Sequence, residues 1–388
     1  MPITSTPAVT THLIRTALNG VEDPEIHRPI TELNMVAGIE IDTENRVTVE
    51  ILLTVSACPL RERIERDVRA AVLGVPPVES VAVNFGVMTD EQRAALRKQI
   101  RGGDDRLDIP FARPGSRTRV YCVASGKGGV GKSSTTVNLA AALTQRNLRV
   151  GILDADIHGH SIPAMLGCAA GPTQVDRMMM PPSVAGIKII SVGMFVDGNE
   201  PIVWRGPMLH RALQQFLTDV YWGDLDILLV DLPPGTGDIA ISLAQLLPTA
   251  ELLLVTTPQH TAARIAERAG AIAAKTEQRV VGIVENMSWY DAPDGSRQTL
   301  FGQGGGAHVS RQLTRLLGVH CPLLGQIPFD PAVCATGDQS TPIVLGAPES
   351  ATTKAFHAIA AALDDRRSDL ARIRLPITPV GPGKQSVK

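Results

Sequence analysis

The stretch GKGGVGKSS, residues Gly126–Ser134, decides the fold of this chain of 388 residues. It has the form G-x-x-x-x-G-K-S and stands between the apolar run VYCVAS and the helix-forming run KSSTTVNLAAALTQ. Backbone N–H groups at a helix N-terminus bind phosphate, and glycines leave the space that the turn and the ligand need. The sequence therefore predicts an ATP-binding loop between a strand and a helix. A glycine-rich turn without function is the alternative, which the flanking strand and helix disfavour.

Positions within this loop have different expected roles. Lys132 is expected to reach the β- and γ-phosphates of ATP and to be catalytic, and the Ser133 hydroxyl is expected to bind Mg²⁺. The expected ATP contacts of the loop are Gly126, Lys127, Gly128, Gly129, Val130, Gly131, Lys132, Ser133 and Ser134.

Acidic residues end two further apolar runs. Asp154 and Asp156 follow VGIL, and Asp231 follows ILLV. A doubly wound sheet places its ligands at the carboxyl ends of its strands, so these acids are expected beside the phosphate loop. Asp154 and Asp231 are the candidate Mg²⁺ ligands besides Ser133, and PPGTGD after Asp231 is a candidate switch loop. An acid at a strand end can also cap a helix, and for Asp238 both interpretations stay open.

The rest of the chain divides into a small α+β domain (residues 1–95), a linker (96–117), an α/β P-loop ATPase domain (118–370) and a disordered tail (371–388). In the first part, helical spacing predicts helices near 13–18, 60–74 and 89–100, and alternation predicts strands at 36–41, 47–54 and 78–85. In the second part, short apolar runs alternate with helical segments, which predicts a doubly wound, mostly parallel sheet. The expected strands are VYCVAS, VGILDAD, IKIISV, DILLVDL, LLLVTT and VVGIVEN, and the last helix is expected at about 352–363.

Composition excludes several other classes of protein. Hydrophobic residues make up 44% of the chain, and no apolar run approaches the ~20 residues that span a bilayer. The N-terminus lacks the basic start and apolar stretch of a secretory signal, so a cytoplasmic protein without a membrane partner is expected. A net charge of −2 disfavours nucleic acid. The five cysteines are scattered and form no CxxC pair, which predicts neither a disulfide framework nor a closed metal site.

The order of several motifs resembles that of the Mrp/ApbC family of P-loop ATPases, which are described as iron–sulfur cluster carriers. The motifs are GKGGVGKSSTTVNLA, ILDADIHGHSIPAMLG, WRGPMLHRALQQFL, DLDILLVDLPPGTGD, LLLVTTPQ, ENMS and FGQGGG. VEDPEI, LNMV and LTVSACP resemble the small domain that precedes the ATPase in many members. The resemblance covers nearly the whole chain.

The resemblance implies roles for three residues and for partners. Lys127 is expected to reach the phosphates of ATP held by a second subunit, so a homodimer bridged by nucleotide is implied; the alternative for Lys127 is a solvated lysine on a loop. Asp156 is expected to orient the attacking water and Asn286 to contact adenine, although Asn286 could instead cap a turn. The implied clients are apo iron–sulfur proteins.

The chain departs from the family pattern at the expected cluster site. The family has a CxxC between ENMS and the glycine-rich loop, whereas residues 289–300 read WYDAPDGSRQTL and contain no cysteine. Thiolates are the usual cluster ligands, so cluster binding at this place is not expected, and the PDG turn predicts a simple hairpin instead. Cys58 matches a family cysteine in the small domain and is the remaining candidate cluster contact.

Other interpretations stay open. His158 and His160 stand where the family has other residues, as a pair that could titrate near neutral pH or as part of a solvated loop. The alternative functions are a positioning ATPase of the MinD/ParA kind and an ATPase adaptor that recruits a client and binds no cluster.

Overall fold

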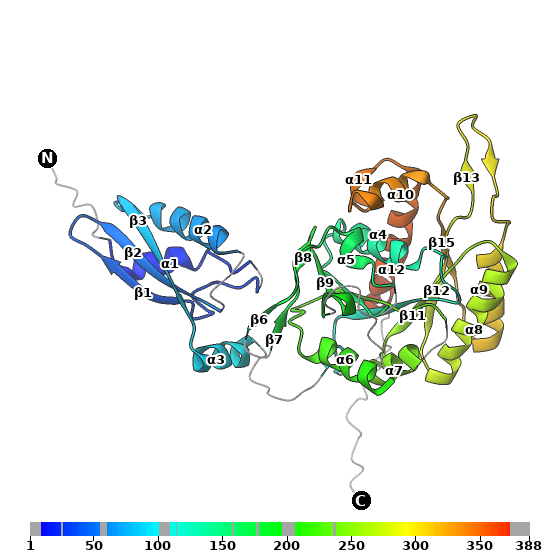
Figure 1. Ribbon diagram of the computed structural model, residues 1–388, viewed down its shortest axis with the longest axis horizontal. Coiled ribbons are helices and arrows are strands. Elements are labelled where there is room, and N and C mark those ends of the chain that lie inside the picture. The colour runs from blue at the N-terminus through cyan, green and yellow to red at the C-terminus, as the bar shows by residue number, and fades with distance from the viewer. Residues whose placement is uncertain are drawn as a thin grey trace, which may run out of the picture.

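A computed structural model describes residues 9–24, 26–54, 60–100, 109–113, 115–156, 159–175, 178–195, 206–235 and 238–372. These residues form a small α+β unit and a larger α/β unit, which lie side by side in Figure 1. The expected fold class, a doubly wound and mostly parallel sheet preceded by a small α+β domain, is confirmed.

The larger unit is built on an eight-stranded sheet in the order β15-β12-β11-β4-β10-β5-β9-β8. Its strands are β4 (Arg119–Ser125), β5 (Val150–Asp154), β8 (Ser183–Val184), β9 (Ile187–Ser191), β10 (Ile227–Asp231), β11 (Glu251–Thr256), β12 (Val280–Glu285) and β15 (Leu323–Gln326). All neighbours pair in parallel except the edge strand β8. The chain runs from β4 outward to β5 and β9, returns to β10 between β4 and β5, and then crosses to β11. This reversal brings the carboxyl ends of β4, β5 and β10 together.

Helices cover both faces of this sheet, which explains the continuous apolar runs of its strands. One face packs against α4 (Lys132–Thr144), α5 (Ile162–Met165), α11 (Ile343–Gly346) and α12 (Ala351–Arg372). The other packs against α6 (Gly206–Thr218), α7 (Asp238–Leu246), α8 (His260–Thr276) and α9 (Gly305–Leu317). The remaining helical elements are η1 (Pro110–Ala112), η2 (Val192–Phe195) and α10 (Pro331–Asp338).

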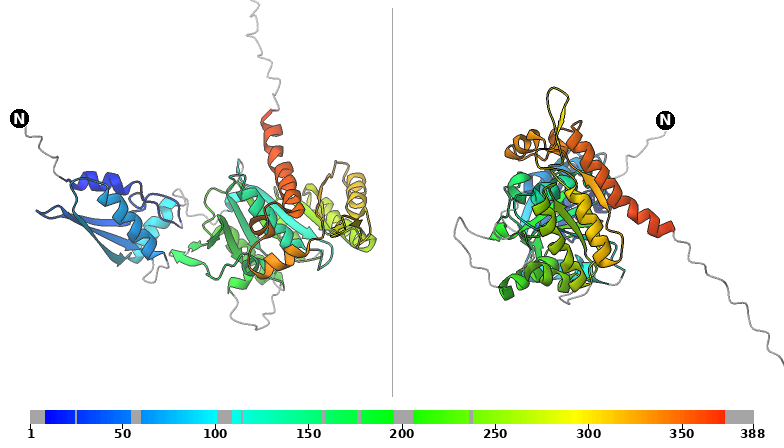
Figure 2. Two further views of the ribbon diagram at one scale, coloured as in Figure 1. Left: turned by 90° about the horizontal axis from the view of Figure 1, so that it is seen from above. Right: turned by 90° about the vertical axis from the view of Figure 1, so that its right-hand side faces the viewer.

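Helix α12 is longer than its apolar spacing predicted. It begins one residue before the expected start and continues to Arg372, where it stands out from the body of the larger unit in Figure 2. Residues 373–388, where most of the expected disordered tail falls, lie outside the described residues. In the part of the chain that the structure describes, no helix combines the length and the apolar character needed to cross a membrane.

The small unit has a three-stranded sheet, β1-β2-β3. Its elements are α1 (Thr11–Leu18), β1 (Val36–Ile41), β2 (Arg46–Leu53), α2 (Arg61–Leu73), β3 (Ser80–Val87) and α3 (Asp90–Ile100). Strands β1 and β2 form the expected antiparallel hairpin, and β3 joins β2 in parallel. Helix α2 buries Ile64, Val68 and Val72, spaced four residues apart on one helix face. Because α3 packs Leu96 into the same core, we place the end of this unit at Ile100 rather than at residue 95.

A hairpin of the larger unit completes the core of the small unit. It consists of β6 (Thr173–Val175) and β7 (Met178–Met180), and Figure 1 shows it reaching toward the small unit. Val175, Met178 and Met180 are buried in the small unit's hydrophobic core. The Met179 side chain lies on the other side of the strand and packs against the core of the larger unit. The Met179 backbone N–H also donates to the Asp219 carbonyl of the larger unit, at 2.8 Å. The β6–β7 hairpin therefore binds both units through alternate side chains.

The substitution Met178→Asp should separate the two units. An aspartate here would bury a charge without a partner, and we expect the free energy of unfolding of the small unit to fall by about 3 kcal/mol. Hydrogen exchange of β1, β2 and β3 measures this effect. Met208→Asp is the matched control, because Met208 is 52% exposed on α6. Equal protection of the small unit in both variants would contradict the role of the β6–β7 hairpin.

Candidate functional site

The phosphate loop connects β4 to α4 at the centre of the sheet. Gly129 and Gly131 have φ angles of 77° and 80°, in the left-handed region that glycine adopts without strain. Gly131 is also needed for space, because a Cβ there would lie 2.3 Å from Nδ2 of Asn286. Helix α4 begins at Lys132, so its free N–H groups face the loop. The strand, loop and helix stand as the sequence predicted.

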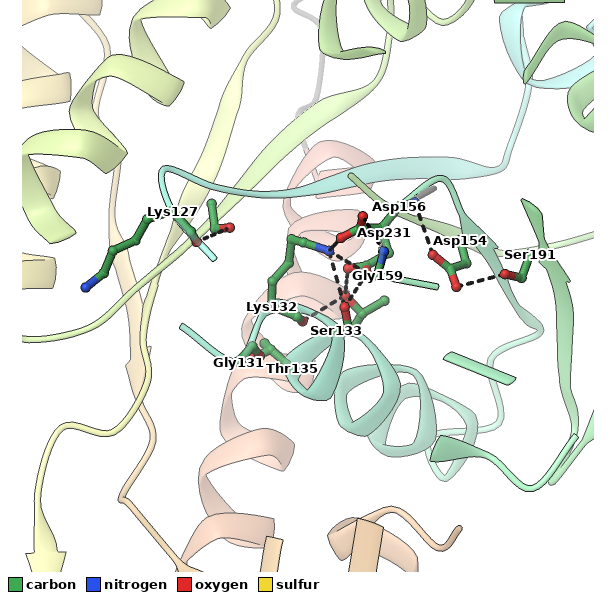
Figure 3. A network of polar contacts seen from close by, with 12 residues as sticks. Lys127, Gly131, Lys132, Ser133, Thr135, Asp154, Asp156, Gly159, Ser191 and Asp231 are labelled. Carbon is green, nitrogen blue, oxygen red and sulfur yellow. Dashed lines mark hydrogen bonds and ion pairs between the residues drawn. The ribbon is translucent and has the colours of Figure 1, made fainter. Parts of the chain in front are cut away.

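The buried carboxylate of Asp231 gathers the polar side chains of the site, as Figure 3 shows. Its Oδ2 accepts hydrogen bonds from Nζ of Lys132 at 2.5 Å and from the Ser133 hydroxyl at 2.6 Å. Its Oδ1 accepts from the Thr136 hydroxyl at 2.7 Å. Asp156 is the second carboxylate near Lys132, with its Oδ2 3.6 Å from Nζ. The structure thus brings four of the expected residues, Lys132, Ser133, Asp156 and Asp231, into one cluster, of which all but the partly buried Ser133 are buried.

Asp154 lies beside this cluster but directs its oxygens elsewhere. Its Oδ2 accepts from the Ser191 hydroxyl at 2.9 Å, and its Oδ1 accepts from the Asp156 N–H at 3.2 Å. Burial and the neighbouring Asp231 charge raise the pKa of the Asp154 carboxyl to about 7. The expectation that Asp154 binds Mg²⁺ stays a prediction.

The donor set at Asp231 fits a magnesium ion. The Ser133 hydroxyl oxygen and a carboxylate oxygen of Asp231 are already neighbours, and Mg²⁺ prefers such hard oxygen ligands together with substrate phosphates. Ser133 and Asp231 would hold the ion, which would neutralise negative charge on the phosphates.

Two adjoining cavities give room for a nucleotide. One of about 210 Å³ is lined by the phosphate loop and Asp156, and one of about 580 Å³ is lined by residues that include Asn286, Met287 and Phe329. Both share Gly131, Ser134, Ser161 and Met165 as lining residues. An anion-binding loop that opens into a wider apolar cavity matches a ligand with phosphates at one end and a flat ring at the other.

The side chain of Asn286 lies between the loop and the wider cavity. Its Nδ2 donates to the Val130 carbonyl at 2.9 Å, and its Oδ1 accepts from the Met287 N–H at 3.0 Å. These bonds hold the phosphate loop against the end of β12. The expected contact between Asn286 and adenine stays a prediction.

Lys127 points away from Lys132 and from the acidic cluster, as Figure 3 shows. Its Nζ donates to Oε1 of Gln259 at 2.9 Å, at the start of α8. Within this one chain, Lys127 is therefore separate from the other candidate catalytic residues.

The interval without cysteine forms the expected hairpin. Strands β13 (Tyr290–Asp291) and β14 (Arg297–Gln298) pair antiparallel and project from the larger unit in Figure 1. The Arg297 guanidinium lies over the Trp289 ring at 4.3 Å and pairs with Asp291 at 2.9 Å. Contacts among its own side chains thus hold this hairpin.

Among the residues that the structure describes, neither His160 nor any of the four cysteines belongs to the polar cluster around Asp231. Cys122 and Cys321 are buried, Cys168 is half-buried, and Cys334 is exposed at the rim of the wider cavity. His160 is exposed. Cys58 and His158 lie outside the described residues.

Three polar residues of the site were missed in the sequence. Thr136 sits one helical turn after Lys132, so its hydroxyl faces the same strand end as the lysine. Ser191 is the last residue of β9, where its position at a strand end was the available signal. Gln259 lies in the motif LLLVTTPQ, but nothing in the motif showed that it would bind Lys127.

Comparison with protein families and relatives gives consistent results. Residues 116–364 match the ParA family model described as NUBPL iron-transfer P-loop NTPase, and residues 12–85 match the model of an iron–sulfur cluster assembly protein. A relative from Mycobacterium tuberculosis, named iron–sulfur cluster carrier protein, is 58% identical over 94% of this chain and 96% of its own length. Relatives with the same name from Deinococcus radiodurans and Bacillus subtilis are 43% and 38% identical, over 93% and 81% of this chain and 96% and 87% of their own lengths.

Solved structures of other proteins are similar to part of this chain. A nucleotide-binding protein from Archaeoglobus fulgidus in complex with ADP is 32% identical, with a TM-score of 0.49 over 65% of this chain and 91% of that protein.

The substitution Lys132→Ala should abolish ATP turnover. It removes the ammonium expected to meet the phosphates, and we expect kcat to fall about a thousandfold. Phosphate release from ATP measures the effect, and circular dichroism checks the fold, since Asp231 loses a buried partner. Lys354→Ala is the control, because Lys354 is an exposed lysine on α12 that pairs with Glu349. Unchanged hydrolysis in Lys132→Ala would disprove the role of the loop.

The substitution Thr136→Val should weaken the magnesium site and keep its shape. Asp231 would lose one of its three side-chain partners, so the Mg²⁺ concentration for half-maximal ATP hydrolysis should rise about tenfold. A Mg²⁺ titration at saturating ATP measures this change. Thr136→Ser keeps the hydroxyl and should behave as the parent chain; a normal Mg²⁺ requirement in Thr136→Val would show that Thr136 does not position Asp231.

Proposed function

This chain belongs to the family of NUBPL-type iron-transfer P-loop NTPases, and from that premise we propose that it is an ATPase that carries iron–sulfur clusters to apo-protein clients. The observation that carries the proposal is that Lys132 and Ser133, at the end of the glycine loop, both donate hydrogen bonds to the Asp231 carboxylate. Relatives matched over nearly the full length bear the name of iron–sulfur cluster carriers, which supports the cargo.

The proposed hydrolysis begins with an exchange of partners at Lys132. Its ammonium is held by Asp231 and lies 3.6 Å from Asp156, and incoming phosphates would take it over as stronger anionic partners. Ser133 and Asp231 are then free to bind the magnesium ion. Asp156 keeps its place through the Gly159 N–H, at 3.1 Å, and would orient the attacking water.

We extend this proposal to a homodimer bridged by nucleotide, in which Lys127 acts on the partner's ATP. Two observations support it: Lys127 points away from its own loop, and its bond to the neutral Gln259 is weaker than a bond to a phosphate would be. Asn286 is proposed to contact adenine from the wall of the wider cavity.

The cluster must be held differently from the usual CxxC arrangement. The hairpin of β13 and β14 supplies no thiolate, so we propose Cys58 as the protein's own cluster ligand. Two copies of Cys58 in a dimer would supply two of the usual four thiolates and leave two positions for cysteines of a client. Such partial coordination suits a protein that passes its cargo on.

An adaptor that recruits a client without binding a cluster is the second candidate function. The absence of cysteine from residues 289–300, which led us to propose Cys58 as the cluster ligand, also favours this adaptor. In that case the small unit would contact the client, and ATP turnover would time the encounter.

Anaerobic reconstitution with iron and sulfide separates these two functions. For the carrier, the parent chain should gain the visible absorbance of an iron–sulfur cluster, and Cys58→Ser should lose it. The double variant Cys168→Ser/Cys334→Ser is the control, because these thiols are partly or fully exposed and should not matter. A parent chain that hydrolyses ATP but gains no absorbance would overturn direct carriage and favour the adaptor.

A further inference from the structure

A second cleft, of about 490 Å³, lies where the two units meet, away from the nucleotide site. The small unit contributes the segment from Ile26 to Arg28 to its lining, and the larger unit contributes Lys188 of β9 and the loop from Tyr221 to Leu225. The Tyr221 hydroxyl donates to the Ile26 carbonyl at 3.4 Å across the junction. A ligand in this cleft would therefore touch both units.

Lys188 carries a half-buried charge with few partners. Its Nζ donates to the Trp222 carbonyl at 3.2 Å and lies 4.8 Å from the centre of the Tyr221 ring. Among the residues that the structure describes, no carboxylate oxygen lies within 4.0 Å of this ammonium. Buried ammonium groups are normally paired, because desolvation penalises the charged form. Here burial lowers the pKa of Lys188 to about 8, with Asp224 opposing the shift and Arg149 adding to it.

The arginines and the aspartate that line the cleft have ionic partners. Arg28 pairs with Glu32 at 3.1 Å, and Arg149 pairs with Asp226 at 3.2 Å. Asp224 lies 3.8 Å from Arg149, and its side chain is 94% exposed. Among the lysine and arginine side chains that line this cleft, Lys188 is thus the one without a carboxylate partner within 4.0 Å, and the Arg149 guanidinium acts on it as a like charge.

Apolar residues form part of the walls around Lys188. They are the half-buried Tyr221 and, with at most 4% of their surface exposed, Ile26, Val150, Trp222 and Leu225. Gly223 has a φ of 63°, and a Cβ at this position would lie 3.2 Å from Nζ of Lys188. A glycine here leaves the approach to the ammonium open. A ligand that suits these walls has an apolar body and one anionic end.

From these contacts we propose that the cleft binds a small organic anion, whose carboxylate pairs with Lys188 and whose apolar body packs against Tyr221. Binding supplies the counter-charge that the protein does not provide. It also adds contacts between the small unit and the larger one.

Benzoate is a suitable probe, because it has one carboxylate and one flat apolar ring. The experiment uses the full chain with Lys132→Ala, which removes the phosphate loop as a second anion site. Calorimetric titration should show benzoate binding, whereas the neutral isostere benzamide should bind at least tenfold more weakly. Adding Lys188→Met should weaken benzoate binding at least tenfold, and adding Lys354→Met should leave it unchanged.

A second measurement does not depend on the Lys188 variant. Limited acetylation followed by mass spectrometry should modify Lys188 several-fold more slowly when benzoate is present, with Lys354 as the internal control. The proposal is overturned if benzamide binds as well as benzoate, if Lys188→Met binds benzoate normally, or if benzoate leaves the acetylation of Lys188 unchanged.

Discussion

The ion pair between Lys132 and Asp231 is the interaction on which the active edge of the sheet depends. Both groups are buried, and a buried charge without a partner costs several kcal/mol. Asp154 and Asp156 crowd the same edge, so one ammonium serves several carboxylates. Burial, and after it the neighbouring Asp231 charge, raises the pKa of the Asp154 carboxyl. The site holds an excess of negative charge at the base of a loop built to bind phosphate, and a cation is the natural complement of that charge.

Much of the fold could be predicted because burial on both faces leaves a clear pattern. The strand at residues 36–41 has the expected bounds, and the apolar runs of the larger unit all became strands of one sheet. The β6–β7 hairpin could not be predicted in the same way. Its strands have three residues each, and β7 consists of methionines, which are not among the β-branched and aromatic residues that mark a strand. Its side chains are ordered by a partner far away in the sequence, which local patterns do not show.

In the candidate site, too, some features could be predicted from local sequence patterns and others could not. The glycine loop and the acids at the ends of β5 and β10 follow from topology, since parallel strands end at one edge. The roles of Thr136 and Ser191 depend on which carboxylate oxygen each hydroxyl meets, and a sequence pattern carries no such geometry. The role of the glycines after Phe301 also depends on a contact that the sequence does not show. The Gly306 N–H donates to the buried Glu285 carboxylate at 2.6 Å, so the start of α9 lies close against β12.

The β6–β7 hairpin also bears on how the chain folds during synthesis. The small unit leaves the ribosome first, but part of its core belongs to Val175, Met178 and Met180, which follow only after the phosphate loop and β5. Until then the nascent small unit exposes apolar surface, of the kind that chaperones recognise and that aggregates. The same logic applies to truncation: a larger unit produced alone would carry those three side chains in water. The two units are joined by a linker in sequence, yet they complete their folding together.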